Sequence, residues 1–183
     1  IVVLGNNVIQ VFDLTQKQRL RSYNLPDGTP ISFWKWVDED NLYYIQGINV
    51  YRWSISSNQN PMLLFNLQPL VASGAIMNVA ASEDQQDVAV FALVREGDQA
   101  VGKVQLYLRD RNSSHVTDAY TCTFATIGGA PYMLHVTKPA GQGVLRFTGL
   151  GLGAAQGQQK VVDLPMMQEC MDDVPFHMVY SPR

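Results

Sequence analysis

Short runs of alternating apolar and polar residues, each ending close to an aromatic residue, recur along the whole chain. Alternation with a period of two places successive side chains on opposite faces of a strand. Four such runs occupy residues 9–13, 50–54, 104–108 and 144–147. Their aromatic residues are 41, 54 and 40 residues apart: Phe12, Trp53, Tyr107 and Phe147. This spacing is close to the period of about 40–50 residues typical of propeller blades, so the pattern predicts four blades of a WD40-like β-propeller.

Further strand candidates lie between these runs at intervals of roughly 8–12 residues, a spacing typical of all-β folds. They are residues 19–23, 31–36, 41–45, 62–65, 75–80, 87–93, 121–127 and 132–137. Turn residues separate them at Asp27-Gly28, Gly128-Gly129 and 56–61. No segment keeps helical spacing for about 10 residues. A β-sandwich whose repeats are coincidental is the alternative, and no linker divides the chain, so we expect one domain over residues 1–183 and no second domain.

The composition narrows the class of protein. Of the 183 residues 16% are charged and the net charge is −3, so there is no basic patch of the kind that nucleic-acid binding needs. The sequence contains no run of about 18 apolar residues, so it indicates neither a membrane span nor a signal peptide. Cys122 and Cys170 lie far apart, which favours a reducing compartment over a disulfide framework, and we expect an intracellular protein. The apolar start at Ile1 indicates a boundary inside a longer chain.

Several patterns could carry enzyme chemistry, and none has the context that it needs. Residues 149–154 match the dinucleotide fingerprint G-x-G-x-x-A, but Gly157 and Pro165 follow where a helix would have to present its N-terminus. A glycine-rich strand end is the simpler interpretation. The initial Ile-Val resembles an activated trypsin-like protease, but the nucleophile and base motifs of that class are missing. We therefore expect no enzyme and no cofactor.

Metal binding and acid–base chemistry are equally unsupported. The histidines His115, His135 and His177 lack a second ligand at the short spacing of a zinc site. The acidic clusters at 38–40 and 172–173 are typical of solvated turns. We expect no catalytic residues and no metal.

A basic stripe in this acidic chain is the main polar feature. Lys17, Arg19 and Arg21 alternate, so on one strand all three would project from the same face. Gln10 and Phe12 also share a face, and a hairpin through residues 14–16 would bring them beside these cations. Such a surface suits an extended peptide with apolar residues and an acidic end. The alternative is an outer strand whose charges simply face water.

Several stretches together resemble the N-terminal domain of the clathrin heavy chain. The strongest are residues 31–37 (ISFWKWV), 49–54 (NVYRWS) and 101–111 (VGKVQLYLRDR). Weaker counterparts lie at 10–12, 63–65, 76–78 and 143–151, and the similarity is thin after about Gln156.

The resemblance implies a seven-bladed propeller that recruits adaptor proteins through short linear motifs and has no catalytic activity. This chain would hold roughly blades two to five and reach into the sixth. The resemblance also implies that the protein is located on the cytoplasmic face of coated pits and coated vesicles and acts in endocytosis and vesicle-mediated transport. The implied partners are Leu-rich acidic motifs of adaptors, the rest of the heavy chain and the light chain, with the membrane reached only through adaptors.

Three binding sites of the family can be carried over. The clathrin-box groove, which takes a Leu-rich pentapeptide ending in an acidic residue, corresponds to residues of the basic hairpin, and two further residues would line its apolar pockets. These are Gln10, Phe12, Lys17 and Arg19, with Val2 and Leu4 for the pockets. Arg19 replaces a lysine and Val8 a threonine of the family. The first-blade half of this groove would precede Ile1, so we expect weak binding.

The other two sites are less complete. A second peptide-binding groove of the family is matched in this chain at Arg111, while Val88 and His115 stand in place of a tryptophan and a glutamine of the family. A third site, on top of the propeller, corresponds to Met77 and Val94, with Ala75 in place of a glutamine. These replacements leave open a second interpretation, in which the propeller is a structural spacer that has lost peptide binding.

Overall fold

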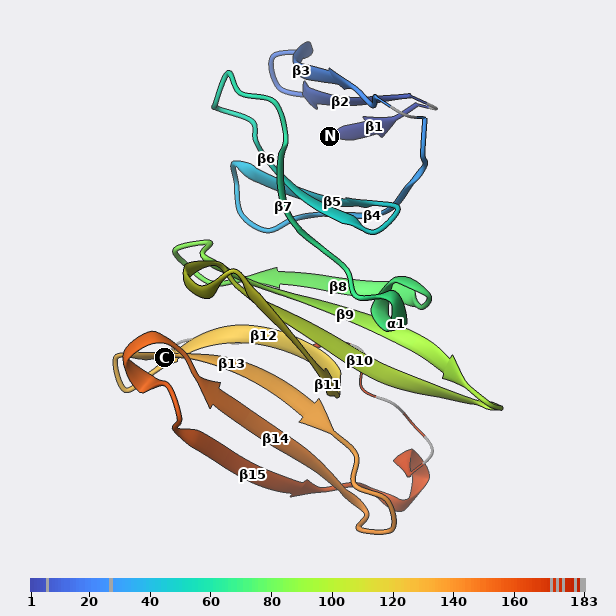
Figure 1. The fold of residues 1–183 in the computed structure, drawn as a ribbon, viewed down its shortest axis with the longest axis vertical. Helices are drawn as coiled ribbons and strands as arrows, with labels where there is room; N and C mark the ends of the chain where they lie inside the picture. Colours follow the sequence, from blue (N-terminus) through green and yellow to red (C-terminus); the bar gives the residue numbers. More distant parts are fainter. Residues whose placement is uncertain are drawn as a thin grey trace. The chain divides into compact units, whose positions relative to one another are not determined.

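The computed structural model describes residues 1–5, 7–26, 28–171, 173, 175, 177–179 and 181, and almost all of its regular structure is strand (Figure 1). The longest helix in these residues, α1 (Pro69–Ala72), has four residues. None of their helices is long and apolar enough to cross a membrane. The prediction of an all-β chain is therefore confirmed.

The strands form four antiparallel sheets in which neighbours in sequence are neighbours in space. The first sheet contains β1 (Val2–Leu4), β2 (Val8–Asp13) and β3 (Gln18–Asn24). The second contains β4 (Ile31–Trp36), β5 (Asn41–Gln46), β6 (Asn49–Ser54) and β7 (Met62–Asn66). The third contains β8 (Ala75–Ala81), β9 (Asp87–Glu96), β10 (Gln99–Leu108) and β11 (Ser113–Asp118). The fourth contains β12 (Tyr120–Ile127), β13 (Ala130–Thr137), β14 (Val144–Gly151) and β15 (Gln159–Pro165). Consecutive up-and-down sheets are the blades of a β-propeller, which confirms the predicted fold class.

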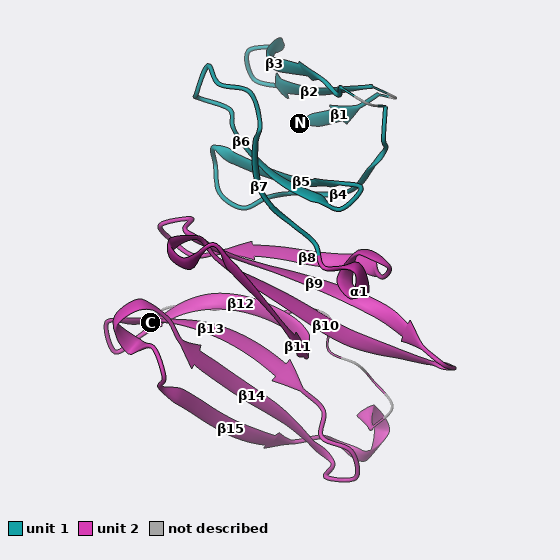
Figure 2. Cartoon of the chain, in the orientation of Figure 1, with its two compact units in different colours: residues 1–67 teal, residues 68–183 magenta. Residues whose placement is uncertain are grey.

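The chain divides into two compact units (Figure 2), residues 1–67 with the first two sheets and residues 68–183 with the last two. After Pro165, the only regular structure in the described residues is the 3₁₀ helix η3 (Gln168–Cys170). The expected single domain, with blades two to five of seven and part of a sixth, stays a prediction.

In the first unit, the core lies between the two sheets. Ile9 and Val11 of β2 pack in one apolar cluster with Leu42, Tyr44 and Trp53 of the second sheet. The rings of Tyr44 and Tyr51 stack with their centroids 4.9 Å apart. This cluster fixes which face of the first sheet is buried.

In the second unit, the third and fourth sheets pack face to face (Figure 1). Phe91 of β9 and Val104 of β10 share a buried cluster with Cys122 of β12 and Met133 of β13. All four residues are fully buried. Two successive blades thus form one continuous core.

The predicted strands all occur, and three more were missed. Every side chain of β15 is exposed, whereas all but the first residue of β5 are buried. The missed strands are β1, β11 and β15. All three are edge strands of their sheets, and polar or exposed strands do not show the buried-face alternation on which sequence patterns depend.

Glycines permit two of the close turns. Gly128 and Gly129 join β12 to β13 with φ of +60° and +78°, as a type I′ hairpin requires. At Gly151, a Cβ would lie 2.0 Å from the carbonyl oxygen of Ala155. Only a three-residue 3₁₀ helix, η2 (Gly153–Ala155), follows, which agrees with a glycine-rich strand end rather than a dinucleotide loop. At the predicted Asp27-Gly28 turn, Asp27 lies outside the described residues.

Candidate peptide-binding sites

The exposed face of the first sheet is formed by residues of β2 and of the segment that pairs with it. Val3 lies opposite Gln10 in the ladder, and the Ile1 amine donates a 2.8 Å hydrogen bond to the carbonyl oxygen of Phe12. Residues directly opposite in an antiparallel pair share a face. Ile1, Val3, Gln10 and Phe12 therefore form one surface, called here the outer face, because Ile9 and Val11 between them face the second sheet.

Val2 and Leu4, which the sequence placed in the same groove, lie on the other face of the sheet. Val2 pairs with Val11, and Leu4 pairs with Ile9. Val2 packs against the apolar cluster that contains Ile9 and Val11. The structure does not bring these two side chains together with Gln10 and Phe12. Sequence reasoning missed Ile1 and Val3, which the pairing of β1 with β2 would have identified had its register been worked out.

The three cations of the basic stripe do not share a face, and that prediction is wrong. Lys17 lies in the turn before β3, with φ of +53°. Arg19 pairs with Phe12 and so lies on the outer face, but a bulge at the next position makes Arg21 pair with Val11. The Arg21 Nε donates a 2.8 Å hydrogen bond to the carbonyl oxygen of Ile55 in the connection after β6. A β-bulge changes which face a side chain occupies.

The outer face is apolar with a polar border. The exposed fractions of Ile1 and Val3 are 61% and 46%. Val8, two residues before Gln10 on β2, lies on the same face and is half-buried. Gln10 offers an amide and Arg19 a guanidinium beside Phe12. This arrangement can bury leucine side chains and pair with one carboxylate.

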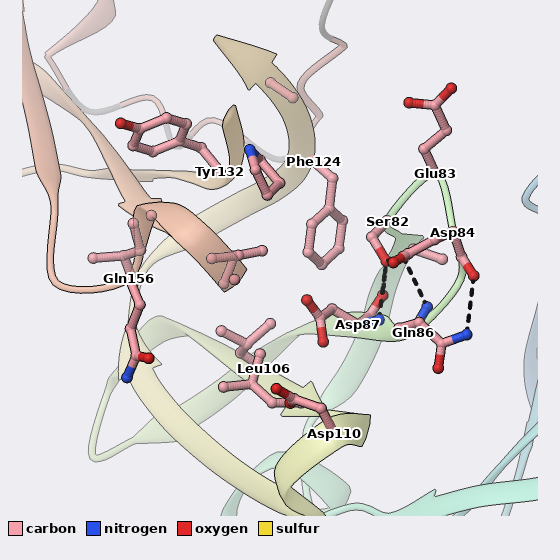
Figure 3. A pocket seen from close by; sticks show the side chains of 18 of the residues that line it. Ser82, Glu83, Asp84, Gln86, Asp87, Leu106, Asp110, Phe124, Tyr132 and Gln156 are labelled. Atoms are coloured by element: carbon pink, nitrogen blue, oxygen red, sulfur yellow. Dashed lines mark hydrogen bonds between the residues drawn. The ribbon is translucent and has the colours of Figure 1, made fainter. Parts of the chain in front are cut away.

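The second predicted groove coincides with a cavity of about 1030 Å³ in the second unit, at one end of the third and fourth sheets (Figure 3). Arg111 and His115 line this cavity, and Val88 does not. His115 lies opposite Leu106 in the ladder and Val88 opposite Tyr107, so the two side chains point to opposite faces. The structure thus brings together two of the three predicted residues.

Arg111 is already engaged with neighbouring side chains. Its Nη2 donates a hydrogen bond to Oε1 of Gln156, and its Nε lies 3.8 Å from a carboxylate oxygen of Asp110. Sequence reasoning missed the acidic side chains that share this cavity. They are Glu83, Asp84, Asp87 and Asp110.

Met77 and Val94, the predicted top site, differ in accessibility. Met77 is the extra residue of a bulge in β8 and is 37% exposed. Val94 is 4% exposed, and a Cβ on Gly74 would lie 2.9 Å from its Cγ2. Val94 therefore offers almost no surface to a ligand.

The acidic cluster at 38–40 stabilises turns. The Asp38 carboxylate accepts hydrogen bonds from the backbone N–H groups of Asp40 and Asn41, at 2.8 and 2.7 Å. The Asp40 carboxylate accepts a 2.5 Å hydrogen bond from the Ser54 hydroxyl, and this bond lowers the pKa of Asp40. Asp172 of the second cluster lies outside the described residues. In the part of the chain that the structure describes, no three His, Cys, Asp or Glu side chains group to hold a metal.

The four consecutive antiparallel sheets define the chain as part of a β-propeller. No family model matches the sequence. The chain is similar to clathrin heavy chains, sharing 24% identity over 188 residues with human clathrin heavy chain 2, which covers 97% of this chain and 11% of that protein. The identity is 27% with clathrin heavy chain 1 of Arabidopsis thaliana, over 94% of this chain and 11% of that protein. It is 25% with clathrin heavy chain of Dictyostelium discoideum, over 64% and 7%.

These matches confirm the resemblance to the clathrin heavy chain that the sequence motifs indicate. The chain is similar to one segment of those proteins, and it spans 11% of the length of the human relative.

Proposed function

We propose that this chain is a non-catalytic module of a clathrin coat that binds short Leu-rich acidic motifs of adaptor proteins on the outer face of its first sheet. The module would act at the cytoplasmic face of coated pits and coated vesicles, together with the rest of a heavy chain and the light chain. It would reach the membrane only through adaptors. The observation that carries the proposal is that Gln10, Phe12 and Arg19 share one exposed face with Ile1 and Val3.

The physical chemistry of this face fits such a motif. Burying a leucine side chain contributes about 25 cal/mol per Å² of apolar area removed from water. The Arg19 guanidinium adds a contact to the acidic end worth about 1 kcal/mol or less, because it is exposed and screened by salt. An affinity in the micromolar range or weaker follows. Many such contacts in a coat would sum by avidity.

The test is a titration of the chain with the fluorescein-labelled peptide Leu-Leu-Gly-Leu-Asp, followed by fluorescence anisotropy. Phe12→Ala and Arg19→Glu should each weaken binding by about fivefold or more, corresponding to about 1 kcal/mol. Arg95→Glu is the matched control, because the exposed Arg95 side chain lies in the other unit. Unchanged affinity in both outer-face variants would show that the face is wrongly assigned.

A purely structural propeller is the second candidate. This candidate is favoured because two residues expected to contact a peptide are buried: Val88 is 1% exposed and Val94 is 4% exposed. In that case the chain would bind no motif peptide at concentrations up to about a millimolar, a range in which weak peptide sites are still detected.

A further inference from the structure

The cavity of the second unit has an apolar floor built by both of its sheets. Leu106 comes from β10, Phe124 from β12, Tyr132 from β13 and Leu150 from β14. Leu106 and Tyr132 are 6% and 2% exposed, so their packing holds the floor rigid. A volume of about 1030 Å³ accommodates several side chains, since ligand sites typically measure about 300–1,000 Å³.

The polar side of the same cavity is acidic. Four carboxylates line it against the single guanidinium of Arg111, which is held by Gln156. The Asp87 and Asp110 side chains point into the cavity, whereas Glu83 points away from it (Figure 3). The Asp84 carboxylate is used within its own loop, where it accepts hydrogen bonds from the Ser82 hydroxyl and the Gln86 backbone N–H at 2.6 and 3.1 Å. Asp87 thus remains as the least compensated charge, and Asp110 adds a second carboxylate that points into the cavity, although it lies 3.8 Å from Nε of Arg111.

The surroundings of Asp87 leave its charge poorly compensated. Burial raises the pKa of its carboxyl group, and the nearby charges of Asp84 and Asp110 raise it further, whereas a backbone hydrogen bond from Arg109 and the charge of Arg111 lower it by a smaller amount. A cation placed between Asp87 and Asp110 would relieve this repulsion, while a second anion would increase it. The charge of the cavity therefore selects against an acidic motif and for a basic one.

We propose that the acidic cavity binds a short extended peptide that carries large apolar side chains followed by Lys or Arg. The apolar side chains pack on Phe124 and Leu150, which are only partly buried. The cationic group lies between Asp87 and Asp110. This specificity is opposite in charge to that of the outer face of the first sheet. The proposal does not depend on the proposed function, because the two sites lie in different units.

The experiment compares two fluorescein-labelled peptides on the full chain by fluorescence anisotropy. Gly-Leu-Phe-Lys-Arg-Gly should bind, and Gly-Leu-Phe-Glu-Asp-Gly should bind at least about tenfold more weakly, because both of its charges are reversed. Gly-Ala-Ala-Lys-Arg-Gly should also bind more weakly, because it lacks the apolar anchor. Affinity for the basic peptide should fall as salt rises from about 50 to 300 mM.

The variants Asp87→Asn and Asp110→Asn keep the shape of each side chain and remove its charge. Each should weaken binding of the basic peptide by about fivefold. Asp98→Asn is the matched control, since it makes the same charge change at an exposed carboxylate in the hairpin between β9 and β10. That hairpin lies about 30 Å along β9 from Asp87, at about 3.3 Å per residue.

Two results would overturn the proposal. One is equal or tighter binding of the acidic peptide. The other is an equal effect of Asp87→Asn, Asp110→Asn and Asp98→Asn, which would indicate attraction to net charge rather than a site. Arg19→Glu should leave the basic peptide unaffected, so a failure here remains distinguishable from a failure of the outer face.

Discussion

Arg21 joins the two sheets of the first unit through its contact with Ile55. The Nε atom donates a 2.8 Å hydrogen bond to the Ile55 carbonyl oxygen, and Nη2 lies 3.4 Å from the carbonyl oxygen of Ser56. The bulge in β3 is what turns this side chain toward the second sheet. A basic residue that the sequence assigned to ligand binding thus has a structural role.

Removal of this link should destabilise the protein. Arg21→Ala should lower the free energy of unfolding by about 1–2 kcal/mol, since it leaves a partly buried carbonyl without its charged donor. Arg19→Ala, two residues away on the outer face, should change it by no more than about 0.5 kcal/mol. Urea unfolding followed by circular dichroism measures both. Equal effects of the two substitutions would contradict the assignment of Arg21.

The opposite orientations of Val3 and Leu4 give a test of the outer face. Val3→Ala should weaken binding of the Leu-rich acidic peptide by about threefold or more. Each methyl group that is no longer buried against the peptide lowers the binding free energy by a fraction of a kcal/mol to about 1 kcal/mol. Leu4→Ala should leave the affinity unchanged, although Leu4 is exposed to a similar extent. Fluorescence anisotropy distinguishes the two. Weaker binding of Leu4→Ala alone would favour the groove that the sequence predicted.

Gly102 holds a close approach between β10 and the start of the fourth sheet. A Cβ at this position would lie 2.3 Å from the Ala119 carbonyl oxygen and 2.7 Å from Cδ1 of Tyr120. Because the Ala119 backbone cannot shift without a large cost in free energy, Gly102→Ala should destabilise the protein by about 2–4 kcal/mol.

Gly149→Ala is the matched control for Gly102→Ala. Its Cβ would meet the Leu134 side chain at 3.1 Å, which can adjust, so the cost should stay near about 1 kcal/mol. Thermal unfolding of the two variants measures the difference. Similar melting temperatures would show that the approach at Gly102 is not tight.

His135 should make stability depend on pH. The residue is 6% exposed, its Nδ1 has no hydrogen-bond partner in the described residues, and burial lowers the pKa of the imidazole. Above about pH 6.5, the pKa of an unfolded histidine, both states are neutral and there is no penalty. Below it the unfolded chain binds a proton that the folded chain does not, so the free energy of unfolding falls until the pH reaches the folded pKa, by up to about 1.4 kcal/mol per pH unit.

Urea titrations between about pH 7.5 and 5 test this, since the carboxyl groups titrate mainly below that range. His135→Met should remove the slope, and His115→Gln, which replaces an exposed imidazole, should retain it. A wild-type slope that persists in His135→Met would assign the effect to another group.

Strand positions followed largely from the sequence, because buried strands require alternating or continuous apolar residues. The run at 41–45 marks β5 for this reason. By contrast, β11 and β15 contain mostly polar or exposed side chains, and hydrogen bonds to the preceding strand hold them in the sheet. Such pairing depends on the neighbouring strand and leaves little periodic signal in the strand itself.

The faces of the candidate sites could not be predicted in the same way. A one-residue change in register moves a side chain to the other face, and the bulge between Val11 and Phe12 makes this change within one hairpin. The acidic cavity likewise combines Asp87, at the start of β9, and Asp110, just after the end of β10, with Phe124 from the next sheet. The number of residues between these side chains in the sequence does not give the distance between them in the folded chain.

The sequence by itself determined the all-β class, the blade repeat and the similarity to clathrin heavy chains, because local periodicity and short motifs carry that information. Only the tertiary structure decided that Arg21 links two sheets, that Val3 rather than Val2 lies beside Gln10, and that the groove at Arg111 is acidic. Those properties depend on strand register and on sheet packing, which bring together residues that are far apart in the chain.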